Sequence, residues 1–380
     1  MNFLFDEDQE SLRDSTRGLL EKLLPPDRIR ELLDSGSGLD EPAWRRGAEQ
    51  GWFSMLVRPE HGGGSLTDQG LVDALVFAEE TGRALAPGPF ISTNVAGFAI
   101  SQSGSPAQQE LLPRIVSGEQ MVTWCLAEEL AGWDAAKMRC SLRRTADGYT
   151  LDGVKLYVES AESADFLLVV ASCDGELVEV LVPATAPGIT IDGHVSLDLS
   201  RRSGAVTFTE VAVPASALLP GFDAEALERQ LQVAAVLSCA DSVGGAERVL
   251  ERTVEYTMER VQFGRTIASF QAVKHRCADL LLLLESARAA THYAALAVSE
   301  KGEDAALAVG LAKAHAADTY ATIAGEGTQL HGGIAFAWEH DMHLFVRRAK
   351  ANQVLFGSSS WHRHRTWPLL QTAAINKSEA

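Results

Sequence analysis

The most informative stretch of the 380-residue sequence is Arg260-Val261-Gln262-Phe263-Gly264-Arg265-Thr266-Ile267-Ala268-Ser269-Phe270-Gln271. A long segment with helical spacing of apolar residues ends at Arg260, a tight Phe263-Gly264 turn follows, and Gln271 opens the next predicted helix. This order brings one guanidinium and one amide near a single point, where the arginine fork suits a pyrophosphate and the Phe263 ring suits a flat ligand. A helix cap, a core aromatic and a plain turn would use the same residues, so the stretch alone leaves both interpretations open.

A second segment of interest is Gln329-Leu330-His331-Gly332-Gly333, which follows another predicted helix. Paired glycines allow backbone N–H groups to approach a phosphate closely, although a simple turn between helices would also use them. Glu339, His340 and Asp341 come soon afterwards, but three contiguous residues do not direct three ligands to one point. We therefore predict no metal site.

Outward from these motifs, the chain divides into three compositional zones. Residues 1–120 show helical periodicity, residues 121–222 contain short apolar runs separated by turn dipeptides such as Asp174-Gly175, and residues 223–380 return to long helical patterns. We predict an α+β fold with an N-terminal helical domain, a central antiparallel β-barrel or sandwich and a C-terminal four-helix bundle. A Rossmann fold is not expected, because no Gly-x-Gly-x-x-Gly follows a predicted strand.

Composition narrows the possible partners. The chain has 33 Lys and Arg against 51 Asp and Glu, a net charge of −18, which disfavours nucleic acid and anionic membranes. An anionic ligand must then be held by local arginines and backbone amides. The N-terminal residues lack the basic region of a signal peptide and no apolar run has the length of a membrane helix, so we expect a cytoplasmic protein with no membrane partner. The five scattered cysteines are expected to be reduced and mostly buried.

Taken together, the two motifs and several others strongly resemble the acyl-CoA dehydrogenase family. The similarity extends over nearly the whole chain and includes Pro59-Glu60-His61-Gly62-Gly63, Glu79-Glu80-Thr81-Gly82-Arg83 and Gly153-Val154-Lys155-Leu156-Tyr157-Val158. It is nearest to the actinobacterial branch of steroid and fatty-acid catabolism, where Arg-Val-Gln-Phe-Gly precedes Phe-Gln-Ala-Val-Lys-His and Trp-Glu-His-Asp occurs late. Members of that branch often form mixed tetramers of two related chains.

The resemblance implies an FAD cofactor shared between subunits. In that family Arg260, Phe263 and Gln271 would reach the FAD of a neighbouring chain, and Gln329, Gly332 and Gly333 would complete the pyrophosphate site. Tyr157, Leu126 and Ala127 would face the isoalloxazine ring. The implied partners are an acyl-CoA substrate, an electron-transfer flavoprotein or oxygen as acceptor, and a second copy or a paralogous chain in a dimer or tetramer. The implied reaction is α,β-dehydrogenation, in which a carboxylate removes the α-proton and FAD accepts a hydride.

The expected catalytic carboxylate is absent from both positions where the family places it. The Glu of the usual Tyr-Glu-Gly-Thr segment is replaced by Phe356, and an early position in the first C-terminal helix holds Ala234. The nearest candidate base is Asp241, whose small and apolar neighbours would raise its pKa if it is buried. A helix-start cap and a buried, hydrogen-bonded carboxylate are the other interpretations of Asp241.

The segments that face the flavin in the family also depart from its pattern. Ala127 lacks a hydroxyl that would bond the flavin, Trp133 replaces a small residue that often touches CoA, and Glu159 replaces a hydroxyl residue near the ring. Three functions therefore remain open: an FAD-dependent acyl-CoA dehydrogenase, a non-catalytic subunit that completes the FAD site of a sister chain, and a flavin oxidase or monooxygenase on the same fold.

Overall fold

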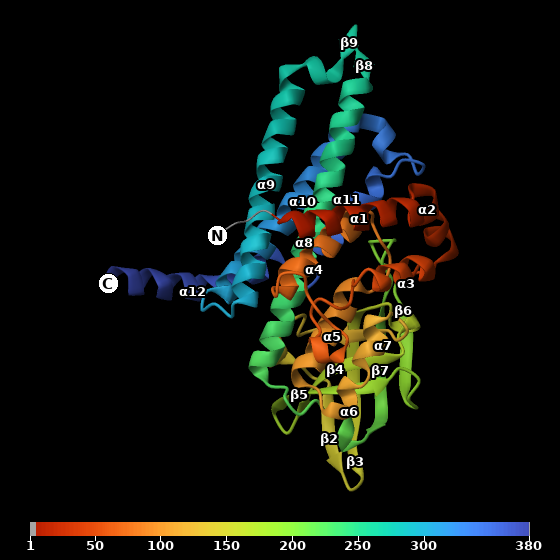
Figure 1. Cartoon of the computed structure of the whole chain (residues 1–380), viewed down its shortest axis with the longest axis vertical. Coiled ribbons are helices and arrows are strands. Elements are labelled where there is room, and N and C mark those ends of the chain that lie inside the picture. Colours follow the sequence, from red (N-terminus) through yellow and green to blue (C-terminus); the bar gives the residue numbers. More distant parts are fainter. Residues whose placement is uncertain (1–4, 380) are drawn as a thin grey trace.

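The computed structural model describes the backbone of residues 5–379 and the side chains of residues 5–371. Helices, then strands, then long helices follow one another along the chain, so the predicted α+β fold is confirmed (Figure 1). The β sheet lies at one end of the molecule, and the connection between the first two long C-terminal helices lies at the other.

The N-terminal part is helical, and its centre is α4. Twelve of the fourteen residues of α4 are buried, because the helix packs against both α1 and the C-terminal helices α8 and α9. The helices of this part are α1 (Glu7–Leu23), α2 (Pro26–Ser35), α3 (Glu41–Glu49), α4 (Gly70–Arg83), α5 (Phe90–Ser103), α6 (Pro106–Gln109) and α7 (Leu112–Val116).

The central sheet has seven strands in the order β1-β4-β2-β3-β7-β6, with β5 paired to β4. Most pairs are antiparallel, as predicted, but β1 runs parallel to β4 with Val122 opposite Phe166. Turn dipeptides cannot reveal a parallel pair, because its strands are far apart in the sequence. The strands are β1 (Val122–Cys125), β2 (Ser141–Thr145), β3 (Gly148–Glu159), β4 (Phe166–Cys173), β5 (Glu176–Pro183), β6 (Ile189–Gly193) and β7 (Ser203–Val213).

The C-terminal part is built on four long helices: α8 (Ala224–Glu259), α9 (Gln271–Ser299), α10 (Ala305–His331) and α12 (Ser359–Glu379). The short strands β8 (Val261–Gln262) and β9 (Arg265–Thr266) join α8 to α9, and α11 (Met342–Asn352) lies between α10 and α12. Packing of α10 against α8, α9 and α12 forms the bundle.

Two glycines set the position of α8 against the N-terminal helices. A Cβ on Gly82 of α4 would lie 2.1 Å from the carbonyl oxygen of Asp241, and a Cβ on Gly244 of α8 would lie 1.8 Å from that of Glu79. Neither contact is possible for a real side chain, so α4 and α8 cross with their backbones in contact. This crossing places Asp241 in the centre of the molecule.

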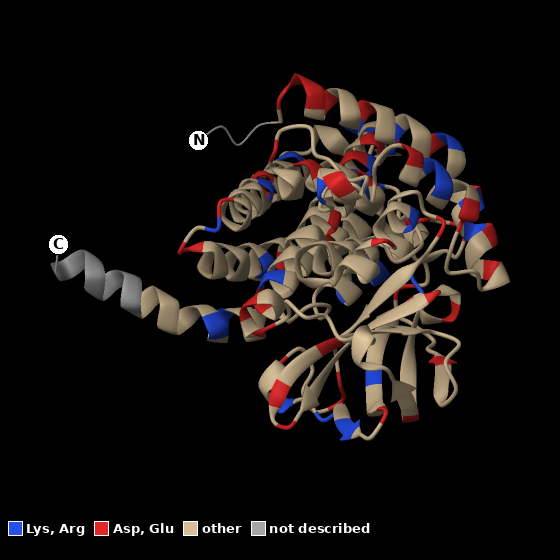
Figure 2. Cartoon of the chain, turned by 60° about the horizontal axis from the view of Figure 1, so that its bottom comes forward, with Lys and Arg blue, Asp and Glu red and all other residues tan. Residues whose placement is uncertain are grey.

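The surface carries both signs of charge, and Figure 2 shows acidic and basic residues interspersed over the helices and the sheet. Among the described residues, no helix is long and apolar enough to cross a membrane. Cys125, Cys140, Cys173 and Cys239 are buried free thiols, and burial raises the pKa of Cys140 to about 11 and that of Cys239 to about 12. These thiols remain protonated at neutral pH.

Candidate functional site

The α8–α9 connection projects from the end of the molecule opposite the sheet (Figure 1). Arg260 is the C-cap of α8, and β8 and β9 form a hairpin whose turn residues Phe263 and Gly264 have φ values of +53° and +77°. Positive φ at both positions is the backbone of a type I′ turn, which favours glycine. Phe263 is 90% exposed, and within the described part of the chain the Arg260 guanidinium has no hydrogen bond or ion pair. The tip therefore presents unpaired groups to solvent.

The hairpin is held in shape by contacts around Phe270. The Arg265 guanidinium lies 4.0 Å from the centre of the Phe270 ring, and Phe263 meets the same ring edge-on at 6.1 Å between centroids. Gln271 is the first residue of α9, as predicted, and its side chain is exposed. Arg260, Phe263 and Gln271 thus belong to one exposed unit, which we call the hairpin clasp.

The end of α10 lies beside the hairpin clasp. The His331 ring stacks on Tyr256, one turn before Arg260, with 4.5 Å between ring centroids. Gly332 ends α10 with a φ of +69°, and a Cβ on Gly332 or on Gly333 would meet nothing within 4 Å. Crowding within the chain therefore does not require these glycines. Gln329, also exposed, belongs to the same end of α10, so both sequence motifs meet at one end of the bundle.

A cavity of about 450 Å³, here called the ring cavity, lies between β3, the loop before β7 and the end of α11. Tyr157 is half exposed at this cavity, and Val195 and Leu197 on the loop are exposed. Its lining residues are Leu156, Tyr157, Glu159, His194, Val195, Ser196, Leu197, Asp198, Arg201, Arg202, Ser203, Lys350, Ala351, Val354 and Leu355. Leu126 and Ala127 do not line it; both are buried behind β3, where the Ala127 carbonyl accepts a hydrogen bond from Leu156 N at 2.8 Å.

Glu159 lines the ring cavity but directs one oxygen away from it. Its Oε2 accepts hydrogen bonds from Ser92 Oγ at 2.6 Å and Ser92 N at 3.3 Å, in the first turn of α5. The N-terminus of a helix stabilises a carboxylate, so a negative group is accommodated at this wall. Ser92 could not be predicted as the partner of Glu159, because the two residues are far apart along the chain.

Asp241 lies in the middle of α8 and is 1% exposed. Its Oδ1 accepts hydrogen bonds from Arg201 and, at 3.4 Å, from Arg348 Nη1, and its Oδ2 accepts one from Asn352 Nδ2 at 2.7 Å. The interpretation of Asp241 as a helix-start cap is wrong, because Asp223 caps α8. Both oxygens of Asp241 already accept hydrogen bonds from buried side chains, so its catalytic role stays a prediction that this geometry does not favour.

The same cluster contains a second carboxylate, Asp198. Its Oδ2 accepts a hydrogen bond from Arg348 Nε at 2.8 Å, and its Oδ1 accepts one from Ser200 Oγ at 2.6 Å. Burial opposes ionisation of Asp198, but Arg348 and Arg201 hold its pKa below the ordinary value. Two acids and two arginines thus form a buried cluster, here called the charge cluster, directly behind the ring cavity.

Phe356, at the position where the resemblance leads us to expect a catalytic Glu, is buried in an aromatic group. Its ring centroid lies 5.0 Å from that of Trp133 and 6.5 Å from that of Trp124. Trp133 Nε1 donates a hydrogen bond to the Val354 carbonyl at 3.2 Å. Trp124, Trp133 and Phe356 form what we call the aromatic partition.

Two buried side chains hold the turn that carries Phe356. Lys313 Nζ donates to the Asn352 carbonyl at 2.7 Å, and His362 Nε2 donates to the Phe356 carbonyl at 2.9 Å. Burial lowers the pKa of Lys313 to about 8 and that of His362 to about 4. His362 is therefore neutral at pH 7, as a donor to a carbonyl oxygen can be.

The aromatic partition separates the ring cavity from two outer cavities. Val354 and Leu355 line the ring cavity, whereas Phe356 lines a cavity of about 260 Å³ beside Trp361. Trp133 lines a third cavity of about 370 Å³, to which Trp361 also contributes. Neighbouring residues of one turn thus face different spaces, and the turn forms the wall between them.

Comparison with known proteins explains this set of motifs. Residues 6–119, 123–211 and 224–366 match the N-terminal, middle and C-terminal domains of acyl-CoA dehydrogenase. The acyl-CoA dehydrogenase IpdE2 of Mycobacterium tuberculosis is 33% identical over 355 residues, which cover 93% of this chain and 94% of that protein. The chain belongs to the acyl-CoA dehydrogenase family.

Solved structures of the family have the same fold. The ChsE4-ChsE5 complex from Mycobacterium tuberculosis superposes with a TM-score of 0.89 at 26% identity, covering 98% of this chain and 99% of that one. A glutaryl-CoA dehydrogenase from Mycobacterium smegmatis in complex with FADH2 superposes with a TM-score of 0.89 at 23% identity, covering 96% and 95%. Homologues in this family thus bind FAD, and the mycobacterial relatives agree with the predicted branch.

Several residues of this acyl-CoA dehydrogenase site were not found from the sequence. Arg201, Arg348 and Asn352 all contact the predicted residue Asp241, and Trp124 stacks on Phe356. One signal was present for Arg348, since it lies four residues after the apolar Leu344 and so on the same face of α11. For Trp124 and Arg201 the sequence contains no such periodic signal.

Proposed function

We propose that this chain is a subunit of an FAD-dependent acyl-CoA dehydrogenase that completes the FAD site of a second chain and does not remove the substrate proton itself. The observation that carries this proposal is the aromatic partition. Phe356 replaces the expected carboxylate and is packed between Trp124 and Trp133, so the position offers neither a base nor space for one.

The need for a second chain is supported by the separation of the two halves of the FAD site. The hairpin clasp and the β sheet lie at opposite ends of the folded molecule (Figure 1). Phe263 at the clasp is 90% exposed, and Val195 at the mouth of the ring cavity is 98% exposed. Exposed apolar groups at both sites favour contact with another molecule, because their burial is then stabilising.

The clasp residues suit the pyrophosphate of FAD. Arg260 has a guanidinium with no partner among the described residues, Gln271 has an exposed amide, and Gly332 and Gly333 have an open backbone that a phosphate can approach. Of the three residues expected at the isoalloxazine ring, Tyr157 lines the ring cavity, whereas Leu126 and Ala127 are buried behind β3. That half suits FAD less well, because Ala127 lacks a hydroxyl and Glu159 places a carboxylate at the wall. FAD supplies the hydride acceptor of the family reaction.

A second candidate function is acyl-CoA dehydrogenation by this chain on its own. The ring cavity favours it, because its volume of about 450 Å³ and the half-exposed Tyr157 leave room for a flat ring. In this case Asp241 would be the base, and one of its guanidinium partners would have to move away. The buried charge cluster opposes such a movement.

Expression of the chain alone and with a related chain that carries the expected Glu separates the two candidates. We expect colourless protein from the chain alone and a yellow, FAD-containing complex from co-expression. Acyl-CoA should bleach the flavin of the complex under anaerobic conditions. Rapid recolouring in air would identify oxygen as the electron acceptor, whereas recolouring only after addition of an electron-transfer flavoprotein would identify that protein.

Variants locate the contribution of each chain. Arg260→Ala in this chain should release FAD from the complex, whereas Arg45→Ala, at an exposed arginine of α3, should not. Asp241→Asn should leave bleaching unchanged. A yellow single chain whose bleaching disappears in Asp241→Asn would overturn the proposal in favour of the second candidate.

A further inference from the structure

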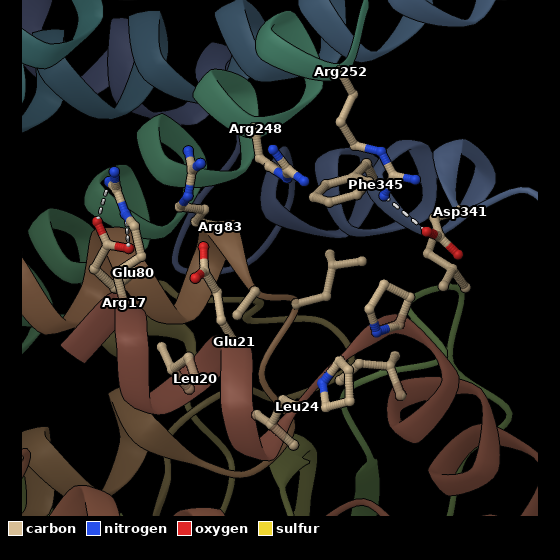
Figure 3. A pocket seen from close by; sticks show the side chains of 16 residues that line it. Arg17, Leu20, Glu21, Leu24, Glu80, Arg83, Arg248, Arg252, Asp341 and Phe345 are labelled. Atoms are coloured by element: carbon tan, nitrogen blue, oxygen red, sulfur yellow. Dashed lines mark hydrogen bonds and ion pairs between the residues drawn. The ribbon is translucent and has the colours of Figure 1, made fainter. Parts of the chain in front are cut away.

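A cavity of about 160 Å³ lies apart from the candidate FAD site, between α1, the α1–α2 turn, the end of α4, α8 and α11 (Figure 3). None of its lining residues lines the ring cavity. They are Arg17, Leu20, Glu21, Leu24, Pro25, Pro26, Ile29, Glu80, Arg83, Ala84, Leu85, Arg248, Arg252, Asp341, Leu344 and Phe345. We call it the arginine cavity.

One side of the arginine cavity is apolar and well packed. Leu20, Leu24, Ile29, Leu344 and Phe345 are each between 2% and 4% exposed, so this wall belongs to the core. A cavity of about 150 Å³ lined by apolar side chains is large enough to bind benzene. The space therefore suits a ligand body of about the size of one six-membered ring.

The other side carries four arginines, of which two are already neutralised. Arg17 forms a bidentate pair with Glu80, at 2.9 Å and 2.7 Å, and Arg83 forms one with Glu251, at 2.9 Å and 2.6 Å. These pairs use both oxygens of each acid. They leave little capacity for a further ligand.

Arg248 and Arg252 remain with unused donors. Arg248 donates one hydrogen bond, to Glu251 at 3.1 Å, and Arg252 donates one, to Asp341 at 2.8 Å. Both acids are shared, because Glu251 also binds Arg83 and Asp341 also binds Arg30 at 2.6 Å. Each guanidinium has five N–H groups, so most of the donors of Arg248 and Arg252 have no protein acceptor within the described residues.

The two arginines are also one turn apart on the same face of α8. Figure 3 shows both extending from α8 toward Phe345, with Leu20 and Leu24 on the opposite wall. Like charges at this spacing repel each other, and an anion between them removes the repulsion. Glu255 lies 3.9 Å from Arg248 toward solvent, and the exposed Glu21 is the acid on the α1 side. The negative charge of these acids disfavours a ligand with more than one negative charge.

We propose that the arginine cavity binds a small monocarboxylic acid with a compact apolar body, such as an aromatic acid. The carboxylate lies between Arg248 and Arg252, and the body rests on Phe345 and Leu24. Because the chain has a net charge of −18, its overall field does not attract an anion, and recognition depends on these two arginines. This site is independent of the candidate FAD site and of the identity of the acyl-CoA.

Calorimetric titration of the full chain with benzoate tests the site, with benzamide and inorganic phosphate as comparison ligands. We expect benzoate to bind at millimolar or lower concentration, benzamide at least ten-fold more weakly, and phosphate not measurably. Arg248→Gln should weaken benzoate binding at least ten-fold. The control Arg45→Gln, which removes an exposed arginine paired with Glu41, should have no effect.

A second variant distinguishes the loss of the binding site from a general loss of structure. Leu24→Phe fills the apolar end of the cavity and should abolish benzoate binding while leaving Arg248 and Arg252 in place. Equal binding of benzoate and benzamide, unchanged binding in Arg248→Gln, or phosphate binding as tight as benzoate would each overturn the proposal. The absence of benzoate binding at about 10 mM, ten-fold above the weakest expected dissociation constant, would also overturn it.

Discussion

The two ends of the α8 segment between Asp241 and Arg260 differ in solvent exposure and in the number of their hydrogen-bond partners. Arg260 is exposed and its guanidinium has no partner in the described part of the chain, whereas Asp241 is 1% exposed and held by three side chains. The resemblance to the family predicts a cofactor contact at the exposed end and a carboxylate at Phe356 or Ala234 near the buried end, and neither of these two residues carries one. Under the proposed function, the exposed end serves another molecule, and the buried end serves the packing of this chain.

The largest expected effect concerns the buried end. Arg348 is fully buried and bonds Asp198, Asp241, Ser200 and the Ala86 carbonyl. Arg348→Met would leave two buried carboxylates with fewer counter-charges, and removal of one partner from a buried pair costs about 3–5 kcal/mol. We expect the free energy of unfolding in urea to fall by about this amount. Arg45→Met, at an exposed pair, should change it by less than about 1 kcal/mol; similar losses in both variants would show that the charge cluster is not structural.

An intermediate loss of stability is expected at acidic pH, because His362 holds the turn that carries Phe356. Burial lowers the pKa of His362 from 6.5 to about 4, so the unfolded chain takes up this proton at a higher pH than the folded chain. Stability from this group is complete above pH 6.5 and is lost as the pH falls toward 4, by no more than roughly 3 kcal/mol. Unfolding in urea at pH 7 and pH 5 should show a smaller loss for His362→Gln than for the wild type. The exposed His364→Gln should behave as the wild type; an identical loss in all three proteins would assign the acid sensitivity to other groups.

The smallest expected effect on stability is at the hairpin clasp. Phe263 is 90% exposed, so Phe263→Ala should change the free energy of unfolding of the chain by less than about 0.5 kcal/mol. The matched variant Phe345→Ala removes a ring that is 3% exposed and should cost about 3–5 kcal/mol. If Phe263→Ala destabilised the single chain by more than about 1 kcal/mol, the clasp would be part of its own core and the contrast between the two ends would fail.

Local patterns were sufficient to predict most of the fold. The turn predicted at Asp174-Gly175 lies between β4 and β5, and the helical periodicity at both ends of the chain corresponds to helices. The Phe263-Gly264 turn was predictable because positive φ favours glycine. The parallel β1–β4 pair was not, since nothing in either strand indicates its distant neighbour.

The site was less predictable than the fold because its determining contacts join distant residues. The small and apolar neighbours of Asp241 in the sequence predict an isolated buried base. In the structure, however, Arg201 from the loop before β7 and Arg348 from α11 both contact it. Likewise, the sequence does not show that Glu159 has a hydrogen-bond partner, because that partner, Ser92, lies on the distant helix α5. The sequence shows which groups are charged, and only the tertiary structure shows which of them are neutralised.

The unbroken length of α8 also has a mechanical consequence. About 19 residues separate Asp241 from Arg260, and at 1.5 Å per residue they form a stiff rod of about 28 Å. A tilt of about 5° where this rod is anchored would displace its far end by roughly 2.5 Å, which is close to the length of one hydrogen bond. In the proposed complex, the direction of the hairpin toward the second chain is therefore set deep inside the protein, and a core substitution that leaves every surface residue unchanged would misalign the two chains.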